Sequence, residues 1–286
     1  AREAVPFLTS VNEGTGRYID HSRNAHDDVA PGSGAALQAF CNTTWRAAES
    51  FRPCDQLKKR RSMNPIDFHS LLDPGTSGEP PAPAALSGRE LQELVSPLDA
   101  GEFVDSFFSR TSVSVKGHPG KFDHIFGWAR LRQALSRGKA LVGTSYNIKA
   151  AFTRGEEAGS SRGMIDADHN QVADLLNAGA TICITDIHLA DPVLCQWAQA
   201  VRAQLNFNGL VGANCYISPD GSGLPTHYDK RVATSIQIAG SKRWRFSMKS
   251  AKPWPLENAV YQPGISADVG TLPEHMEFGE VELNPG

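Results

Sequence analysis

Residues 214–246 decide the fold, and their sequence is NCYISPDGSGLPTHYDKRVATSIQIAGSKRWRF. Side chains of two kinds alternate along three of its segments, as they do in strands. The segments are residues 214–217, 232–238 and 242–246. The last two flank an Ala-Gly-Ser sequence that is typical of a hairpin turn. Because these strands come after a series of predicted helices, the order favours an α+β fold in which a helical entry packs on a β-barrel or sandwich.

Working outward towards the N-terminus, the sequence alternates between helical and strand patterns. Ser87 is a candidate N-cap for the first helix, and Gly138 and a later glycine are helix stops. Asp191 and Pro192 are typical of a cap and a first turn. Helices are predicted at residues 87–98, 100–110, 121–138, 166–180 and 191–205, and strands at residues 111–117, 140–152 and 181–187.

The first part of the chain differs in character from the rest. It holds a basic run at residues 58–61, which we interpret as solvated charge, with nucleic-acid binding as the alternative. A segment rich in Pro, Gly and Ala follows at residues 73–88. We therefore predict that residues 1–88 form a poorly ordered extension and linker, and that residues 89–286 form the domain.

Composition excludes several classes of protein. The 286 residues carry a formal charge of −3, which argues against a protein that coats nucleic acid. The five cysteines are odd in number and include no CxxC pair, so a disulfide scaffold or structural zinc site is not indicated. No apolar run is long enough for a membrane span. The expectation is a cytoplasmic protein without a membrane or direct nucleic-acid partner.

Lys242 stands at an unusual position in its predicted strand. Its parity places it on one face with Trp244 and Phe246, opposite two arginines. A lysine on an apolar face is costly unless an anion meets it. The anion could be a buried carboxylate or a ligand, and the alternative is that the side chain extends along the sheet to reach solvent.

His227 and Asp229 are two residues apart at the start of a predicted strand, so both side chains leave it on the same face. Such a pair supplies two members of the 2-His-1-carboxylate triad that binds non-haem Fe(II) with open coordination positions. The motif is common by chance, and the alternative is a surface histidine near an aspartate.

In combination, these features resemble the cupin-type JmjC oxygenases, especially the branch that contains the ribosomal-protein hydroxylases. That family has a pattern like N-x-Y-x-[ST]-P-x-G-x-G-x-x-x-H-Y-D, followed by x-x-Q-x-x-G-x-K-x-W. The resemblance covers residues 89–286, and the loop before the histidine is slightly shorter than in some relatives. The matching residues are Asn214, Tyr216, Pro219, Gly221, Gly223, His227, Tyr228, Asp229, Gln237, Gly240, Lys242 and Trp244.

The resemblance implies a double-stranded β-helix, preceded by helices and C-terminally incomplete, and a role for each matched residue. It makes His227 and Asp229 iron ligands, and it makes Lys242 the partner of the distal carboxylate of 2-oxoglutarate. Tyr216 and Asn214 would line the same pocket. His188 could also line it, although a structural role is the favoured interpretation, and Trp244 is interpreted as core.

The resemblance also implies an Fe(II)/2-oxoglutarate-dependent dioxygenase that hydroxylates a protein or peptide side chain. Demethylation of methyl-lysine is the less favoured reaction. Two alternatives remain open at this point: a catalytically silent cupin-fold module that binds a peptide, and a small-molecule hydroxylase on the same fold.

A facial triad needs a second histidine, and in the resembled family it follows an L-x-P-G-D turn. Leu283, Pro285 and Gly286 match that turn as far as its glycine. His275 lies before the turn, and we interpret it as a surface residue. We therefore expect the missing ligand after Gly286, an inactive 286-residue fragment, and an open sheet edge that favours association, including a homodimer.

Overall fold

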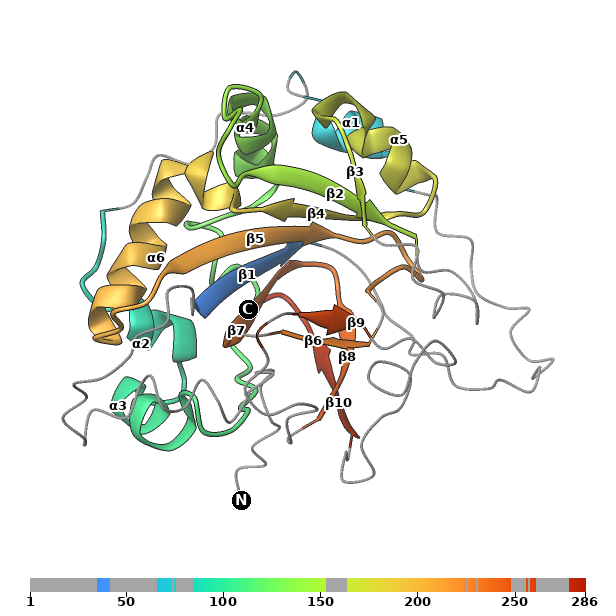
Figure 1. Cartoon of the computed structure of the whole chain (residues 1–286). Coiled ribbons are helices and arrows are strands. Elements are labelled where there is room, and N and C mark those ends of the chain that lie inside the picture. Colours follow the sequence, from blue (N-terminus) through green and yellow to red (C-terminus); the bar gives the residue numbers. More distant parts are fainter. Residues whose placement is uncertain are drawn as a thin grey trace.

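Six strands form the central sheet, and the computed structural model shows helices along one side of it (Figure 1). The structure describes residues 35–41, 66–73, 75, 85–152, 164–224, 226–229, 231–247, 256, 258–260 and 278–286. In spatial order the strands of the sheet are β3 (Ile165–Asp166), β2 (Asn147–Ala151), β4 (Thr181–Thr185), β5 (Val211–Ile217), β1 (Ala35–Cys41) and β7 (Ala233–Ala239).

Two small sheets lie on the other side of the central sheet (Figure 1). In one, β8 (Lys242–Ser247) pairs antiparallel with β10 (Phe278–Leu283). In the other, β6 (His227–Tyr228) pairs antiparallel with β9 (Ala259–Val260). The helices and the antiparallel sheets agree with the predicted α+β class. The double-stranded β-helix stays a prediction.

The central sheet is antiparallel from β3 to β5, and β1 is parallel to both of its neighbours, β5 and β7. In the register of β1 with β5, Ala35 pairs with Val211 and Cys41 with Ile217. The sequence analysis placed these residues of β1 in the N-terminal extension, outside the domain. In the structure, they supply an interior strand.

The helices follow the predicted order with shorter bounds. Among the described residues, Asp191 caps α6 as expected, because its carboxylate accepts a hydrogen bond from the backbone N–H of Leu194 at 2.9 Å. The bounds are α1 (Phe68–Leu72), α2 (Glu90–Val95), α3 (Ala100–Glu102), the π-helical η3 (Phe103–Phe107), α4 (Trp128–Gly138), the short η5 (His169–Gln171), α5 (Val172–Asn177), η6 (Ile187–Leu189) and α6 (Pro192–Gln204).

Three predictions differ from the structure. The strand predicted at residues 140–152 is confined to β2, because residues 142–145 form turns and bends. Residues 111–117 form no extended strand, although Val113 is buried as the alternation predicts. Alternation reports which side chains are buried, whereas a strand also needs a neighbour to pair with. Ser87 does not cap α2 directly, because its hydroxyl accepts the N–H of Arg89 at 3.1 Å. Glu90 is the first residue of the helix.

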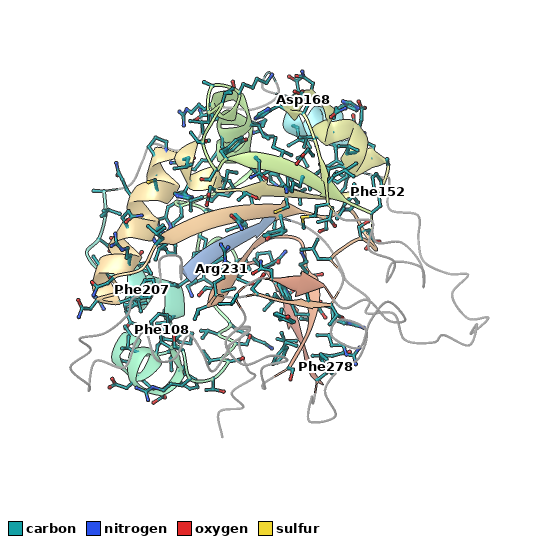
Figure 2. The ribbon with its side chains drawn as sticks, viewed as in Figure 1. Phe108, Phe152, Asp168, Phe207, Arg231 and Phe278 are labelled. Carbon is teal, nitrogen blue, oxygen red and sulfur yellow. The ribbon has the colours of Figure 1, made fainter. Side chains whose placement is uncertain are left out.

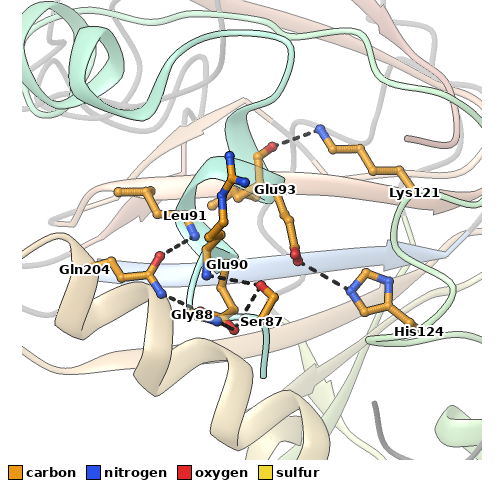
Figure 3. Close-up of polar contacts among 10 residues, drawn as sticks. Ser87, Gly88, Glu90, Leu91, Glu93, Lys121, His124 and Gln204 are labelled. Atoms are coloured by element: carbon orange, nitrogen blue, oxygen red, sulfur yellow. Dashed lines mark hydrogen bonds and ion pairs between the residues drawn. The ribbon is translucent and has the colours of Figure 1, made fainter. Parts of the chain in front are cut away.

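Glu90 is 1% exposed, and its hydrogen bonds connect α2 to the C-terminal turn of α6 (Figure 3). Its carboxylate accepts hydrogen bonds from the Gly88 N–H at 2.9 Å and from the side-chain amide of Gln204. The Gln204 carbonyl accepts the Leu91 N–H at 2.8 Å. Burial raises the pKa of Glu90, but these hydrogen bonds outweigh it and hold the pKa below its usual value.

The central sheet has one apolar and one more polar face, because side chains alternate along each strand. The apolar face belongs to the main core and is covered by the helices, and Phe108 meets Phe207 edge-on at its margin (Figure 2). The other face is turned to the two small sheets. The residues on this face include Lys149 of β2, Cys183 of β4 and Tyr216 of β5. Cys183 is the register partner of both Lys149 and Tyr216.

Gly138 ends α4 directly against Tyr146, and a Cβ at this position would overlap the phenol ring. Tyr146 itself stacks on His169, with ring centroids 5.7 Å apart. We expect Gly138→Ala to lower the free energy of unfolding by about 1–3 kcal/mol, as overpacked sites do. Denaturant unfolding measures this loss. Gly127→Ala is the control, since its Cβ would meet open space, and equal losses in both variants would contradict the explanation.

No helix in the described parts of the chain combines the length and the apolar composition needed to cross a bilayer.

Candidate functional site

His227 and Asp229 lie together at the start of β6 and just after it, as predicted. The distance from His227 Nε2 to Asp229 Oδ2 is 3.9 Å. Their side chains are 32% and 16% exposed, so the pair is partly accessible to solvent. Within the described ranges, no group of three or more His, Cys, Asp or Glu residues is arranged to hold a metal ion.

Tyr216 brings β5 to the same region. It is 7% exposed, and its hydroxyl hydrogen-bonds with the side chains of Asn214 and Cys183. Burial raises the pKa of Tyr216 well above its ordinary value, and the negative charge of Asp229 adds to this rise.

Asn214 is oriented by the chain segment that follows β4. Its side-chain carbonyl accepts the backbone N–H of Asp186 at 3.0 Å. Asp186 is left-handed, with φ of 50°, a conformation that aspartate tolerates better than most residues. Because the carbonyl is engaged there, the amide NH₂ is the end of Asn214 that can reach Tyr216.

Lys242 is 2% exposed, so the prediction that it lies on the inner face of its strand is confirmed and the solvent-reaching alternative is wrong. Its Nζ lies 5.9 Å from the centroid of the Trp244 ring. Burial lowers the pKa of Lys242 to about 7, and Cys215 and Cys183 oppose this effect.

Sequence reasoning missed Cys183. It is 4% exposed and forms a small cluster with Tyr216, against which Leu224 and Trp244 pack. The alternation in the β4 sequence could have assigned Cys183 to one face, but nothing in it shows that this face is shared with Tyr216 of β5. Trp244, which we interpreted as core, belongs to this cluster and not to the main core.

His188 is structural, as interpreted. Its Nδ1 accepts the backbone N–H of Ala213 at 3.1 Å, and its side chain is 11% exposed. Several other residues that the sequence singled out lie outside the described residues. They are His275, the basic run at 58–61 and the prolines of the linker at residues 80–83.

Comparison with known proteins shows what this part of the chain is similar to. Residues 190–281 match the JmjC domain family. The predicted resemblance to the JmjC oxygenases of the ribosomal-oxygenase branch is confirmed by this match and by several relatives. The matched region includes His227, Asp229, Tyr216 and Lys242.

Among the relatives is the bifunctional lysine-specific demethylase and histidyl-hydroxylase NO66 of Caenorhabditis elegans, 29% identical over 177 residues, which cover 60% of this chain and 23% of the relative. Ribosomal oxygenase 1 of Gallus gallus is 27% identical over 162 residues, covering 53% of this chain and 25% of the relative. Ribosomal oxygenase 2 of Rattus norvegicus is 44% identical over 50 residues, covering 17% of this chain and 11% of the relative. The chain thus spans about a quarter or less of these curated relatives.

Proposed function

We propose that this chain provides the metal- and co-substrate-binding part of an Fe(II)/2-oxoglutarate-dependent dioxygenase that hydroxylates a protein or peptide side chain. The observation that carries the proposal is the buried Lys242, 2% exposed, in a region that also holds the His227–Asp229 pair. An imidazole beside a carboxylate suits Fe(II), and a desolvated ammonium suits a dicarboxylate.

The donor set fits the metal that the family implies. His227 offers a neutral imidazole nitrogen and Asp229 a carboxylate oxygen, and the two side chains already lie 3.9 Å apart. These would be two of the protein ligands. His275, the later histidine that we interpreted as a surface residue, lies outside the described residues.

The polar side chains fit 2-oxoglutarate as a co-substrate. Lys242 would pair with its distal carboxylate, and the Tyr216 hydroxyl would donate a second hydrogen bond to it. Both side chains are buried, so the bound dianion would be shielded from water. When bound, the iron supplies the oxidative chemistry in which O₂ converts 2-oxoglutarate to succinate and CO₂ while a substrate C–H becomes C–OH.

The protein-substrate assignment rests on the names of the relatives, which describe a histidyl-hydroxylase and demethylase and ribosomal oxygenases. Hydroxylation stays our preferred reaction. We also propose that the strands form a double-stranded β-helix, that the protein acts in the cytoplasm, and that it forms a homodimer.

Anaerobic titration of the full-length protein with Fe(II), with and without 2-oxoglutarate, tests the proposal. We expect a visible metal-to-ligand absorption band only when both are present, followed by succinate release on addition of O₂. Binding of both without succinate release would favour a catalytically silent binding module. Absence of binding to a chain that is shown to be folded would contradict the proposed site.

In the full-length protein, Asp229→Ala is expected to remove Fe(II) binding and succinate release, because it deletes the carboxylate ligand of the proposed site. Iron per chain and succinate are the two quantities to measure. Asp220→Ala is the matched control, since Asp220 is exposed in the preceding loop. A normal iron content and rate in Asp229→Ala would exclude this residue as a ligand.

A further inference from the structure

We infer that Cys183 is a positioning residue that, together with Asn214, holds the hydroxyl of Tyr216 in place for the co-substrate. Cys183 lies on β4, outside the stretch that matches the JmjC family, which begins at residue 190. The inference rests on the proposed function and deepens it, because it assigns a task to a residue that neither the sequence motifs nor the family match includes.

The first step is the strand register. β4 and β5 are antiparallel, and Cys183 is the direct partner of Tyr216. Directly opposed residues of an antiparallel pair have their side chains on the same face, with Cβ atoms about 4.5–5.5 Å apart. The neighbours of Cys183 along the strand, Ile182 and Ile184, are fully buried in the main core on the opposite face. The thiol therefore belongs to the pocket face.

The second step is the direction of the hydrogen bonds. The carbonyl of Asn214 accepts the Asp186 N–H, which leaves its NH₂ to donate to the Tyr216 oxygen. The Tyr216 O–H then donates to the sulfur of Cys183. The hydroxyl is thus held from both sides, by an amide that is itself fixed by backbone and by a thiol that is fixed by the register.

The third step concerns the strength of these bonds. Sulfur is a weak acceptor, so the Tyr216 proton can leave Cys183 for a stronger acceptor such as a carboxylate without a large loss. The thiol is 4% exposed and cannot be replaced by bulk water. Cys183 therefore keeps the phenol of Tyr216 oriented in the free chain. When a carboxylate enters, the Tyr216 O–H donates its hydrogen bond to the carboxylate in place of the sulfur.

The charges around the thiol are consistent with a place beside the metal-binding pair. Asp229 acts electrostatically on both Cys183 and Tyr216. From the other side, Lys149 of β2 is the register partner of Cys183, and its positive charge also acts on the thiol. Cys183 thus lies between a half-exposed lysine and the pocket tyrosine.

Three variants separate hydrogen bonding from packing. Cys183→Ala removes both, Cys183→Val restores volume without an acceptor, and Cys183→Ser restores an acceptor. We expect the Kd for 2-oxoglutarate, measured by anaerobic calorimetry on the full-length protein with Fe(II) present, to rise about five- to tenfold in the Ala and Val variants, because the phenol that Cys183 no longer orients must then be ordered when the co-substrate binds. Cys183→Ser should stay within about threefold of the parent. Cys195→Ala, a cysteine change on α6, should have no effect.

A second measurement needs no co-substrate. In a chain with ¹³C-labelled tyrosine rings, the Cζ resonance of Tyr216 is identified by its loss in Tyr216→Phe. This resonance should shift in Cys183→Ala and Cys183→Val, move less in Cys183→Ser, and stay unchanged in Cys195→Ala. If it does not move in the Ala and Val variants, Cys183 does not hold Tyr216 and the inference is wrong.

The two measurements also separate this inference from the proposed function. If the parent chain fails to bind Fe(II) and 2-oxoglutarate, the proposed function fails, while the tyrosine resonance still decides whether Cys183 positions Tyr216. If the parent binds and the Val variant binds equally well, the thiol acts through packing alone and the positioning role is wrong.

Discussion

Lys242→Met is expected to weaken 2-oxoglutarate binding by the full-length protein and, at the same time, to raise the melting temperature of the ligand-free chain. The loss of a charge-assisted pair in a closed pocket corresponds to about 1.5–3 kcal/mol, or roughly 10- to 150-fold in affinity. The gain arises because Lys242 is 2% exposed and desolvation lowers its pKa to about 7. An apolar side chain of similar length avoids that desolvation, and such replacements stabilise by on the order of 1–4 kcal/mol.

The pH dependence of stability provides a second check on Lys242. An unfolded lysine has a pKa of about 10.4, so between pH 7 and pH 10 the unfolded chain binds a proton that Lys242 in the folded chain has released. Stability therefore rises with pH across this window. Lys121, whose pKa burial lowers to about 8, contributes in the same direction and is unchanged in the variant.

Denaturant unfolding of the parent and of Lys242→Met between pH 6.5 and 9.5 measures this difference. The rise should be steeper in the parent, and the advantage of the variant should shrink as the pH increases. Lys242→Arg serves as the comparison that keeps a charge, and we expect it to bind 2-oxoglutarate poorly because a planar guanidinium does not replace a point charge. Unchanged affinity for 2-oxoglutarate in Lys242→Met would exclude Lys242 from the pocket.

Local periodicity was sufficient to predict the parts of the site that lie on single strands. The two-residue period put His227 and Asp229 on one face, and the structure places them 3.9 Å apart. The same period put Lys242 inside, where it is 2% exposed. Within a strand, the covalent geometry alone fixes which residues share a face, so no knowledge of the partner strands was needed.

Contacts between strands distant in sequence could not be predicted in this way. Cys183 reaches Tyr216 because β4 pairs with β5 in one particular register, and a shift by one residue would turn it to the opposite face. The orientation of Asn214 depends on the backbone N–H of Asp186, which follows a different strand. Neither contact can be inferred from the local composition of the two segments that it joins.

The N-terminal part of the chain shows the same limit at the scale of the fold. Residues 35–41 lie in a region whose composition predicted an extension, and their parallel pairing with β5 and β7 depends on residues about 170 to 200 positions later. Composition describes how much apolar surface a segment can bury, whereas a strand inside a sheet is determined by the neighbours that are available to pair with it.

Asp191→Ala is expected to lower the free energy of unfolding by about 3–5 kcal/mol, which is a large fraction of the roughly 5–15 kcal/mol by which native proteins are stable. Asp191 is fully buried, and its Oδ2 lies 3.8 Å from Nη1 of Arg130, which is 5% exposed on α4. Its Oδ1 also caps α6 through the Leu194 N–H at 2.9 Å. The variant removes the cap and deprives a buried guanidinium of its carboxylate.

Capping and charge can be separated experimentally. Asp191→Ser keeps a capping oxygen, so it should be about 1 kcal/mol more stable than Asp191→Ala while still lacking the negative charge. If the rest of the loss comes from the guanidinium left without its carboxylate, adding Arg130→Met to Asp191→Ser should recover stability, and the two changes should be strongly non-additive. Asp168→Ala is the control, because Asp168 caps the exposed η5 through the Asn170 N–H at 2.7 Å and should lose only the capping energy. Additive losses from Arg130→Met and Asp191→Ser would show that the two side chains do not stabilise the fold as a pair, and that the junction of α4 with α6 depends on packing alone.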